Sequence, residues 1–402
     1  MSAPGLLRAL LTGLILSALA SAAAPLLTGA ERPPRPTVLT LLLEAPEPTL
    51  RSGQVEYTSQ RRSYTLSITP EQLRQSLTQN SLSPLTETLR PIYRQIEARR
   101  PRDARFEWTG SAWVARAQTG WTVRRPETAR AVLAALRAKR TQARLEVALS
   151  APERSVRLLK ARRVTTRLAT GQSSFAGSPA FRVHNIRVGS SKLSGQWLSP
   201  GAVFDFNALV GRITPAQGFV PGYVITGGTL SLEDGGGICQ VSTTVFRAAY
   251  QAGLGIVERH AHSHQVSYYD PTGYEATVYA PSLNLRFRND TRSPLLLQAS
   301  WDLKAQTLRM DLFGAPPDRT VSVSEPSIRN RRLALPPSYL PDPELKPGQT
   351  ERIDMPASGM EVSLKRTVTF ADGRVRTSTL NSKYRPWGGV FAVHPADPRL
   401  RR

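Results

Sequence analysis

The sequence predicts a multidomain α+β protein, with a basic α+β segment, a second α+β segment that carries a cysteine-bearing helix packed on β-strands, and a β-rich extension. The chain has 402 residues, which exceeds the size at which a single hydrophobic core stops growing. Strand-like alternation and helical apolar stripes both occur along it. Residues 90–167 hold 20 Lys and Arg against 6 Asp and Glu, a net +14, whereas residues 185–292 are nearly neutral.

The start of the chain has the pattern of a secretory signal. Arg8 precedes an uncharged stretch, residues 9–30, and Ala20-Ser21-Ala22 offers small residues at the positions that a signal peptidase reads. We therefore expect a signal peptide over residues 1–22, a proline-rich linker over 23–36 and export to the cell envelope, either periplasmic or extracellular. The alternative is an uncleaved membrane anchor, because 22 uncharged residues could just span a bilayer.

The basic segment that follows is predicted to be an α+β domain. Strand-like runs lie at Val38–Leu43, Tyr64–Ile68 and Leu145–Leu149, and helices are expected to start at Pro70 and to cover 126–138. The whole chain has a formal net charge of +23, which suits an anionic partner. We expect peptidoglycan or another anionic envelope polymer; the alternative is an arginine-rich face that serves only solubility. Binding to nucleic acid is not expected, because export and the lack of an aromatic–basic binding motif argue against it.

The single cysteine lies behind a glycine cluster. Gly235-Gly236-Gly237 precedes Cys239, and the apolar residues beyond it recur at helical spacing as far as Gly253. A cysteine in the first turn of a helix has a lowered pKa, and the free N–H groups there could also bind an oxyanion. The alternative is a small buried hydrophobic side chain. One cysteine excludes an internal disulfide framework, a four-cysteine zinc site and a two-cysteine redox pair.

Three histidines and an acid follow the cysteine. His260, His262 and His264 alternate, so a strand would project all three to one side, and Glu275 begins another strand-like run, 274–278. Cysteine, histidine and carboxylate in this order suit a thiol nucleophile, its base and an orienting group, by analogy with papain-like and transglutaminase-like folds. The competing reading is a metal site of three imidazoles. Since the cluster contains no acid, we expect no metal and no cofactor.

The central segment resembles the VanW family over roughly residues 181–300. The residues that carry the resemblance are Asn185-Ile186, Ser199-Pro200-Gly201, Phe204-Asp205-Phe206, the segment 235–244, Glu258-Arg259, His262-Ser263, Tyr268, Gly273, Ala276-Thr277-Val278 and Asn289. Upstream, residues 106–149 are similar to the peptidoglycan-binding-like domain that often precedes VanW domains. Downstream, the chain is similar to the G-five domain, a β module implicated in binding N-acetylglucosamine polymers, at Pro341-Asp342-Pro343, Lys346-Pro347-Gly348, Gly359, Arg366, Asp372-Gly373 and Tyr384-Arg385-Pro386.

These resemblances imply the domain boundaries. We expect a basic peptidoglycan-binding-like domain over residues 37–167, a VanW-like domain over 168–315, a G-five-like tail over 316–395 and a basic end over 396–402. Glycines are sparser in the tail than in the G-five pattern, which leaves sugar binding there in doubt.

The resemblance implies a cell-envelope role, and two functions follow from it. The first is an exported protein that binds peptidoglycan. The second is a cysteine-dependent hydrolase or acyltransferase on wall peptides, with Cys239 as nucleophile, His262 as base and Glu275, where the family usually has Asp, as the orienting group. The residues expected to line the binding site are Gly235, Gly236, Gly237, Gln240, Thr243, Arg259, His260 and His264.

Overall fold

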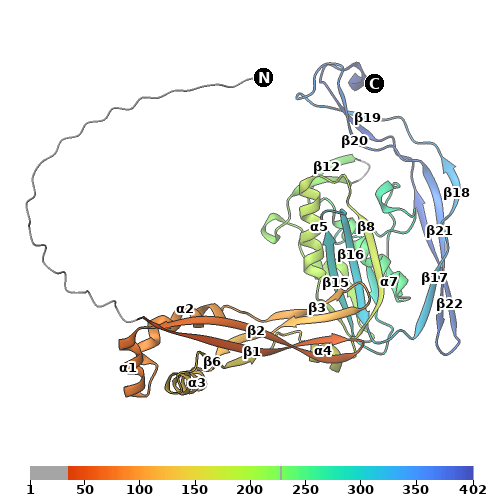
Figure 1. Cartoon of the computed structure of the whole chain (residues 1–402). Helices are drawn as coiled ribbons and strands as arrows, with labels where there is room; N and C mark the ends of the chain where they lie inside the picture. Colours follow the sequence, from red (N-terminus) through yellow and green to blue (C-terminus); the bar gives the residue numbers. More distant parts are fainter. Residues whose placement is uncertain (1–34, 227–228, 402) are drawn as a thin grey trace, which may run out of the picture.

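The computed structural model describes residues 35–226 and 229–401, which form helices and several separate β-sheets (Figure 1). The predicted signal peptide and most of the predicted linker lie outside the described residues, as does Arg402. No helix in the described part of the chain is long and apolar enough to cross a membrane.

The basic module, residues 37–167, is built on a long hairpin whose two strands pair along their full length. Ser52 and Gly53 form the turn, both with positive φ. One sheet has the order β2-β1-β4-β3, with β6 parallel to β1, and β5 pairs with β7 separately. The elements are β1 (Thr37–Arg51), β2 (Gln54–Ile68), α1 (Pro70–Gln79), α2 (Thr86–Glu97), β3 (Arg102–Trp108), β4 (Trp113–Gln118), β5 (Gly120–Val123), α3 (Arg125–Arg137), β6 (Gln142–Leu145), β7 (Val147–Ser150) and α4 (Val156–Ala161).

Local sequence explains where the helices of this module begin. Thr69 accepts a hydrogen bond from the Gln72 backbone N–H while the Gln72 side chain accepts one from Thr69, a capping box that starts α1 at Pro70. The single strand predicted over Leu145–Leu149 is wrong. The backbone of Glu146 is bonded to Thr128 and Arg124 at the start of α3, so the chain changes sheets there.

The central segment, residues 168–315, holds an antiparallel sheet of order β8-β16-β15-β9, and α7 contacts both β8 and β16. Gly171 on β8 permits this packing, because a Cβ there would lie 1.9 Å from the Thr244 carbonyl oxygen of α7. Its elements are β8 (Thr166–Ser174), α5 (Ala180–Leu193), β9 (Trp197–Leu198), β10 (Val203–Asp205), α6 (Phe206–Val210), β11 (Pro221–Thr226), β12 (Thr229–Asp234), α7 (Ile238–Gln251), β13 (Gly255–Glu258), β14 (Arg286–Arg288), β15 (Leu295–Asp302) and β16 (Thr307–Gly314).

The tail, residues 316–401, consists of two small sheets dominated by a second long hairpin, β21–β22 (Figure 1). Met360, Val362, Leu364 and Tyr384 belong to the same hydrophobic cluster as α7, so the tail and the central segment share a core. The strands are β17 (Arg319–Val323), β18 (Ser327–Arg332), β19 (Ser338–Pro341), β20 (Thr350–Asp354), β21 (Gly359–Phe370), β22 (Val375–Tyr384) and β23 (Val390–Val393).

Candidate active site

Cys239 lies in the first turn of α7, directly behind the glycine cluster. Gly235 and Gly237 have positive φ, and Gly237 is the residue that precedes the helix. Cys239 as a whole residue is partly exposed. Its Sγ atom lies 3.3 Å from Thr277 Oγ1 and 3.5 Å from the Val278 carbonyl oxygen. The N–H groups of Ile238 and Gln240 in this turn donate to the carbonyls of Gly235 and Gly237. The Cys239 N–H is therefore the first-turn donor that could face a developing oxyanion.

His262 is held by Glu275 through two hydrogen bonds. The ring Nδ1 lies 2.5 Å from Glu275 Oε2, and the His262 backbone N–H donates to Oε1 at 3.1 Å. Only 17% of the His262 side chain and 2% of the Glu275 side chain are exposed. With Nδ1 bound to the carboxylate, the other ring nitrogen is free for the hydrogen bond between His262 and the Cys239 thiol.

Glu275 is positioned by groups from two further elements. The Tyr384 hydroxyl, at the end of β22, donates to Glu275 Oε1 at 2.8 Å. The Arg259 guanidinium donates to the Glu275 backbone carbonyl at 2.6 Å and to Ser382 Oγ at 2.9 Å. The carboxylate therefore sits in a buried frame to which the tail contributes a donor.

These contacts shift the pKa values of all three groups. Burial alone would raise the pKa of Cys239, but the hydrogen bond and charge of His262 outweigh it and hold that pKa below its ordinary value. Burial would lower the pKa of His262, but the charge of Glu275 and the bond to Cys239 raise it. Burial would likewise raise the pKa of Glu275, but His262 and Tyr384 lower it. Each group thus stabilises the charged form of the other, the imidazolium favouring the thiolate and the thiolate the imidazolium.

Two adjacent tyrosines lie beside this site. The ring of buried Tyr269 stacks on His262 with centroids 5.1 Å apart, and Tyr268 meets Tyr269 edge-on at 4.8 Å. Tyr268 is 50% exposed and lies under the guanidinium of Arg182, 4.6 Å from the ring centroid. The imidazole of His262 is thereby fixed by a carboxylate at its Nδ1 edge and by an aromatic ring against one face.

The central segment is similar in sequence to known proteins. Residues 181–313 match the family model described as VanW like protein. They form a VanW-like domain. The chain is 38% identical over 135 residues to the uncharacterized protein YoaR of Bacillus subtilis (strain 168), and 29% identical over 115 residues to the vancomycin B-type resistance protein VanW of Enterococcus faecalis (strain V583). The matches cover 34% and 27% of this chain, and less than half of either relative, 44% and 42%.

Cys239, His262 and Glu275 are brought together inside the VanW-like domain, but the other two histidines of the cluster point elsewhere. The prediction of a strand over the cluster is wrong, since β13 ends at Glu258. His260 Nε2 bonds to Glu258, and His264 Nδ1 bonds to the Arg385 carbonyl, with its ring against Trp387. The predicted strand over 274–278 is reduced to a single bridge between His260 and Thr277.

The remaining predicted site residues serve to hold α7 in the VanW-like domain. Gln240 donates to Ser173 Oγ and the Ser174 carbonyl on β8, and its buried Oε1 has no partner among the described residues. Thr243 both donates to and accepts from the backbone of Ala276. The three glycines, 235–237, shape the turn before the helix. Across residues 35–226 and 229–401, no three His, Cys, Asp or Glu side chains are grouped so that they could hold a metal ion.

Tyr269, Tyr384 and Thr277 were not predicted as site residues. Tyr384 lies 109 residues beyond Glu275, so spacing near the cysteine could not reveal it. The sequence pattern that could have indicated Tyr384 is the match of Tyr384-Arg385-Pro386 to the G-five domain, at the end of the tail.

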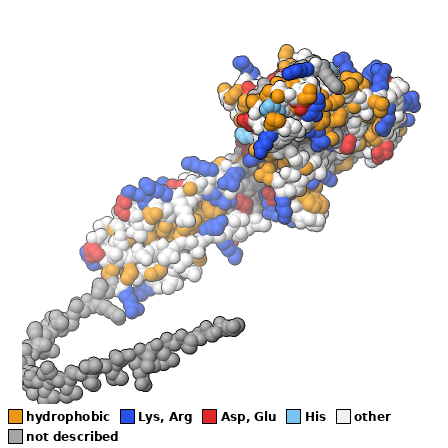
Figure 2. All heavy atoms as spheres, turned by 90° about the horizontal axis from the view of Figure 1, so that it is seen from above, with side chains coloured by type: hydrophobic (Ala, Val, Ile, Leu, Met, Phe, Trp, Pro, Cys, Tyr) orange, Lys and Arg blue, Asp and Glu red, His pale blue; other side chains and the backbone are white. Residues whose placement is uncertain are grey.

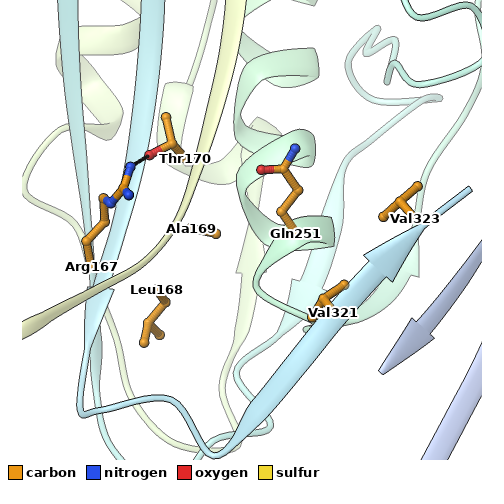
Figure 3. A pocket seen from close by; sticks show the side chains of 7 residues that line it. All are labelled: Arg167, Leu168, Ala169, Thr170, Gln251, Val321 and Val323. Atoms are coloured by element: carbon orange, nitrogen blue, oxygen red, sulfur yellow. Dashed lines mark hydrogen bonds between the residues drawn. The ribbon is translucent and has the colours of Figure 1, made fainter. Parts of the chain in front are cut away.

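A separate pocket of about 440 Å³ lies between β8, β17 and Gln251, at the opposite end of α7 (Figure 3). Twelve helical residues separate Gln251 from Cys239, a distance of about 18 Å, so this pocket is not part of the thiol site.

Proposed function

We propose that the protein is a cysteine-dependent hydrolase or acyltransferase of the cell envelope that acts on wall peptides. The observations that carry this proposal are the hydrogen bond between His262 and the buried Glu275 carboxylate and the lowering of the Cys239 pKa by His262, in a residue that is partly exposed. A cysteine with only a packing role would not require a neighbouring histidine that two hydrogen bonds fix to a buried carboxylate.

The geometry suits acyl transfer through a thioester. The Cys239 thiolate attacks the carbonyl carbon of an amide, and the Cys239 N–H at the start of α7 stabilises the oxyanion that forms. The His262 imidazolium gives its proton to the leaving amine as the C–N bond breaks, which leaves an acyl thioester and neutral imidazole. Water or a second amine then attacks the thioester, His262 takes its proton, and the thiolate is released.

Three observations direct the proposal to the envelope. The N-terminal sequence has the pattern of a secretory signal. One relative is named a vancomycin resistance protein, and vancomycin acts on the cell wall. The basic module concentrates positive charge, and Lys and Arg side chains are spread over its visible face (Figure 2). Sugar binding by the G-five-like tail stays a prediction.

The experiment is digestion of purified wall peptides by the full chain and by Cys239→Ala, followed by mass spectrometry. The wild type should release or exchange an acyl group and carry a thioester mass on Cys239 in single turnover, and Cys239→Ala should do neither. Turnover that survives in Cys239→Ala would overturn the proposal. A matched control is Cys239→Ser, which keeps the size of the side chain but not the thiolate.

A second proposed function is wall binding by the basic module. A pocket of about 350 Å³ is lined there by Trp121, Arg99, Arg100 and Arg125 among others. The Trp121 indole N–H is buried and has no acceptor within the described residues. Arg99 pairs with Glu47 and Arg125 with Glu97, whereas no carboxylate of the described chain pairs with the exposed Arg100. Co-sedimentation of the full chain with purified peptidoglycan at low salt tests this function, and failure to sediment contradicts it.

A further inference from the structure

Arg182 lies against the glycine that precedes α7 and, among the described residues, forms no ion pair with a carboxylate. A Cβ built on Gly237 would lie 2.9 Å from Arg182 Cγ, so the arginine side chain passes directly over the glycine that precedes α7. Gly237 and Cys239 are two residues apart, and two residues span at most about 7 Å of chain. The charges of Arg182 and Cys239 both act on the Tyr268 hydroxyl, so both groups lie around the same tyrosine.

The partners of this guanidinium are neutral. It donates to Ser178 Oγ at 2.6 Å and lies over the ring of Tyr268. In the part of the chain that the structure describes, no Asp or Glu forms an ion pair with Arg182. Other arginines around α7 are fully engaged: Arg247 and Arg366 donate to several buried carbonyls, and Arg319 pairs with Asp290. Arg182 thus presents an uncompensated positive charge in a partly exposed position.

A series of ring contacts joins this charge to the imidazole beside Cys239. Tyr268 carries the guanidinium on one face and contacts Tyr269, which in turn stacks on His262. The half-exposed Tyr268 therefore places the arginine next to the aromatic pair that borders the thiol site. A guanidinium presents paired N–H donors that match a carboxylate.

We propose that Arg182 binds a substrate carboxylate next to the amide that Cys239 attacks, so that the substrate class is an anionic peptide with a free carboxylate near the cleaved bond. This inference rests on the proposed function, because it concerns the substrate of the same thiol. Arg182 acts as a specificity residue on the acyl or the amine side of that bond.

The first test compares alkylation of Cys239 in the full chain by iodoacetate and by iodoacetamide, two reagents that differ in one negative charge. In both reactions the thiolate forms a C–S bond and displaces iodide. Arg182→Gln should lower the ratio of the iodoacetate rate to the iodoacetamide rate by about three- to ten-fold, as expected for loss of one nearby charge. Arg182→Lys should keep most of the ratio. Raising the salt concentration should reduce the wild-type ratio more than that of Arg182→Gln.

The matched control is Arg187→Gln, which removes an exposed arginine from the same helix, where it lies over Trp301. Its ratio should equal that of the wild type. An unchanged iodoacetamide rate in Arg182→Gln shows that the thiol site is intact. A ratio unaffected by Arg182→Gln overturns the inference while leaving the proposed function standing. A Cys239 thiol that reacts no faster than a free thiol peptide with either reagent overturns the proposed function, and this inference with it.

The second test uses wall peptides in which the terminal and the internal carboxylates are amidated in turn. With the peptide that keeps the recognised carboxylate, Arg182→Gln should raise KM about three- to ten-fold. With the peptide amidated at that carboxylate, wild type and Arg182→Gln should be equal. The position whose amidation removes the difference identifies the carboxylate, and a difference that survives both amidations contradicts the inference.

Discussion

Cys239 and His262 each shift the pKa of the other, so the thiol of this single cysteine is ionised below its usual range. An ordinary cysteine thiol has a pKa of about 8.5. We expect the rate of iodoacetamide alkylation of the wild type to reach half its maximum at a lower pH. In His262→Gln the imidazolium is gone and burial is opposed only by the bonds to Thr277 and Val278, so the pKa of Cys239 rises. The midpoint should therefore move to higher pH than in the wild type, measured by mass spectrometry across a pH series.

His260→Gln is the matched control for this experiment. His260 lies two residues away and bonds to Glu258 rather than to the thiol site, so its removal should leave the midpoint where it is. An identical pH profile for wild type and His262→Gln would mean that His262 does not stabilise the thiolate, and the proposed triad would be wrong.

The sequence alone pointed to three residues that the fold places in contact. Cys239 was identified because a glycine cluster followed by helical apolar spacing is a local pattern, and local patterns survive folding. The alternate spacing of His260, His262 and His264 predicts a strand that would group the three side chains on one side. After Glu258 the chain instead bonds to Glu275 and to the tail, and these contacts separate the three rings. Partners that lie this far away in the sequence leave no pattern in the residues around the histidines.

Strand β22 brings the tail into the thiol site through one hydroxyl group. Tyr384→Phe removes the donor to Glu275 Oε1 but keeps the ring in the shared core. Loss of a buried hydrogen bond to a charged group should reduce the free energy of unfolding by about 1.5–3 kcal/mol. Because Glu275 then holds His262 less firmly, the alkylation midpoint of Cys239 should rise, by less than in His262→Gln. Thermal unfolding and the alkylation series measure the two effects.

Tyr339→Phe serves as the matched control within the tail. The Tyr339 ring lies against Phe391 and Arg399, away from Glu275, so this variant should leave the reactivity of Cys239 unchanged. A Tyr384→Phe protein that loses stability but keeps the wild-type midpoint would limit Tyr384 to a structural role.

The packing of α7 on β8 depends on Gly171. In Gly171→Ala the new methyl group would meet the Thr244 carbonyl oxygen and the Ala248 nitrogen, both backbone atoms that cannot rotate away. Overpacking of this kind costs about 1–3 kcal/mol, and a lower melting temperature should follow. Gly255→Ala is the control, since only Asp290 Oδ2, at 3.7 Å, lies near a Cβ there. Equal melting temperatures for both variants would show that helix and strand can separate at little cost.

Among the secondary-structure elements, the sequence predicts best those helices in which an amphipathic pattern follows a residue that starts or caps a helix. The helices begun by Pro70 and by the residues around Pro126 lie within one residue of their predicted starts. The sequence predicts strands only at the open end of the hairpin β1–β2, Val38–Leu43 and Tyr64–Ile68, because the rest of β2 has few apolar residues. For the tail, resemblance predicts β structure but not the hairpin β21–β22, whose packing on α7 through buried Arg366 depends on contacts more than a hundred residues away.

Across the whole molecule, the predicted boundary at residue 315 separates segments that are joined physically. Arg319 and Arg376 of the tail both pair with Asp290, and tail residues complete the core around α7. The basic module also packs on the central segment, because Phe106 stacks on Phe313 with centroids 4.0 Å apart. The thiol site thus combines residues of the central segment and of the tail, which resemblance treats as separate modules.

The charge of the basic module should act through its pocket as well as through diffuse attraction. Arg100→Gln removes an arginine that lines the pocket beside Trp121, and Arg62→Gln removes an exposed arginine from β2, outside the residues that line the pocket. Both variants lose one charge, so both should bind peptidoglycan slightly less at low salt. Arg100→Gln should also lose about three- to ten-fold affinity for a soluble wall fragment, measured by calorimetry, because it removes a charge in contact with the ligand. Equal affinities for the two variants would mean that the wall is held by diffuse charge and that the pocket does not bind it.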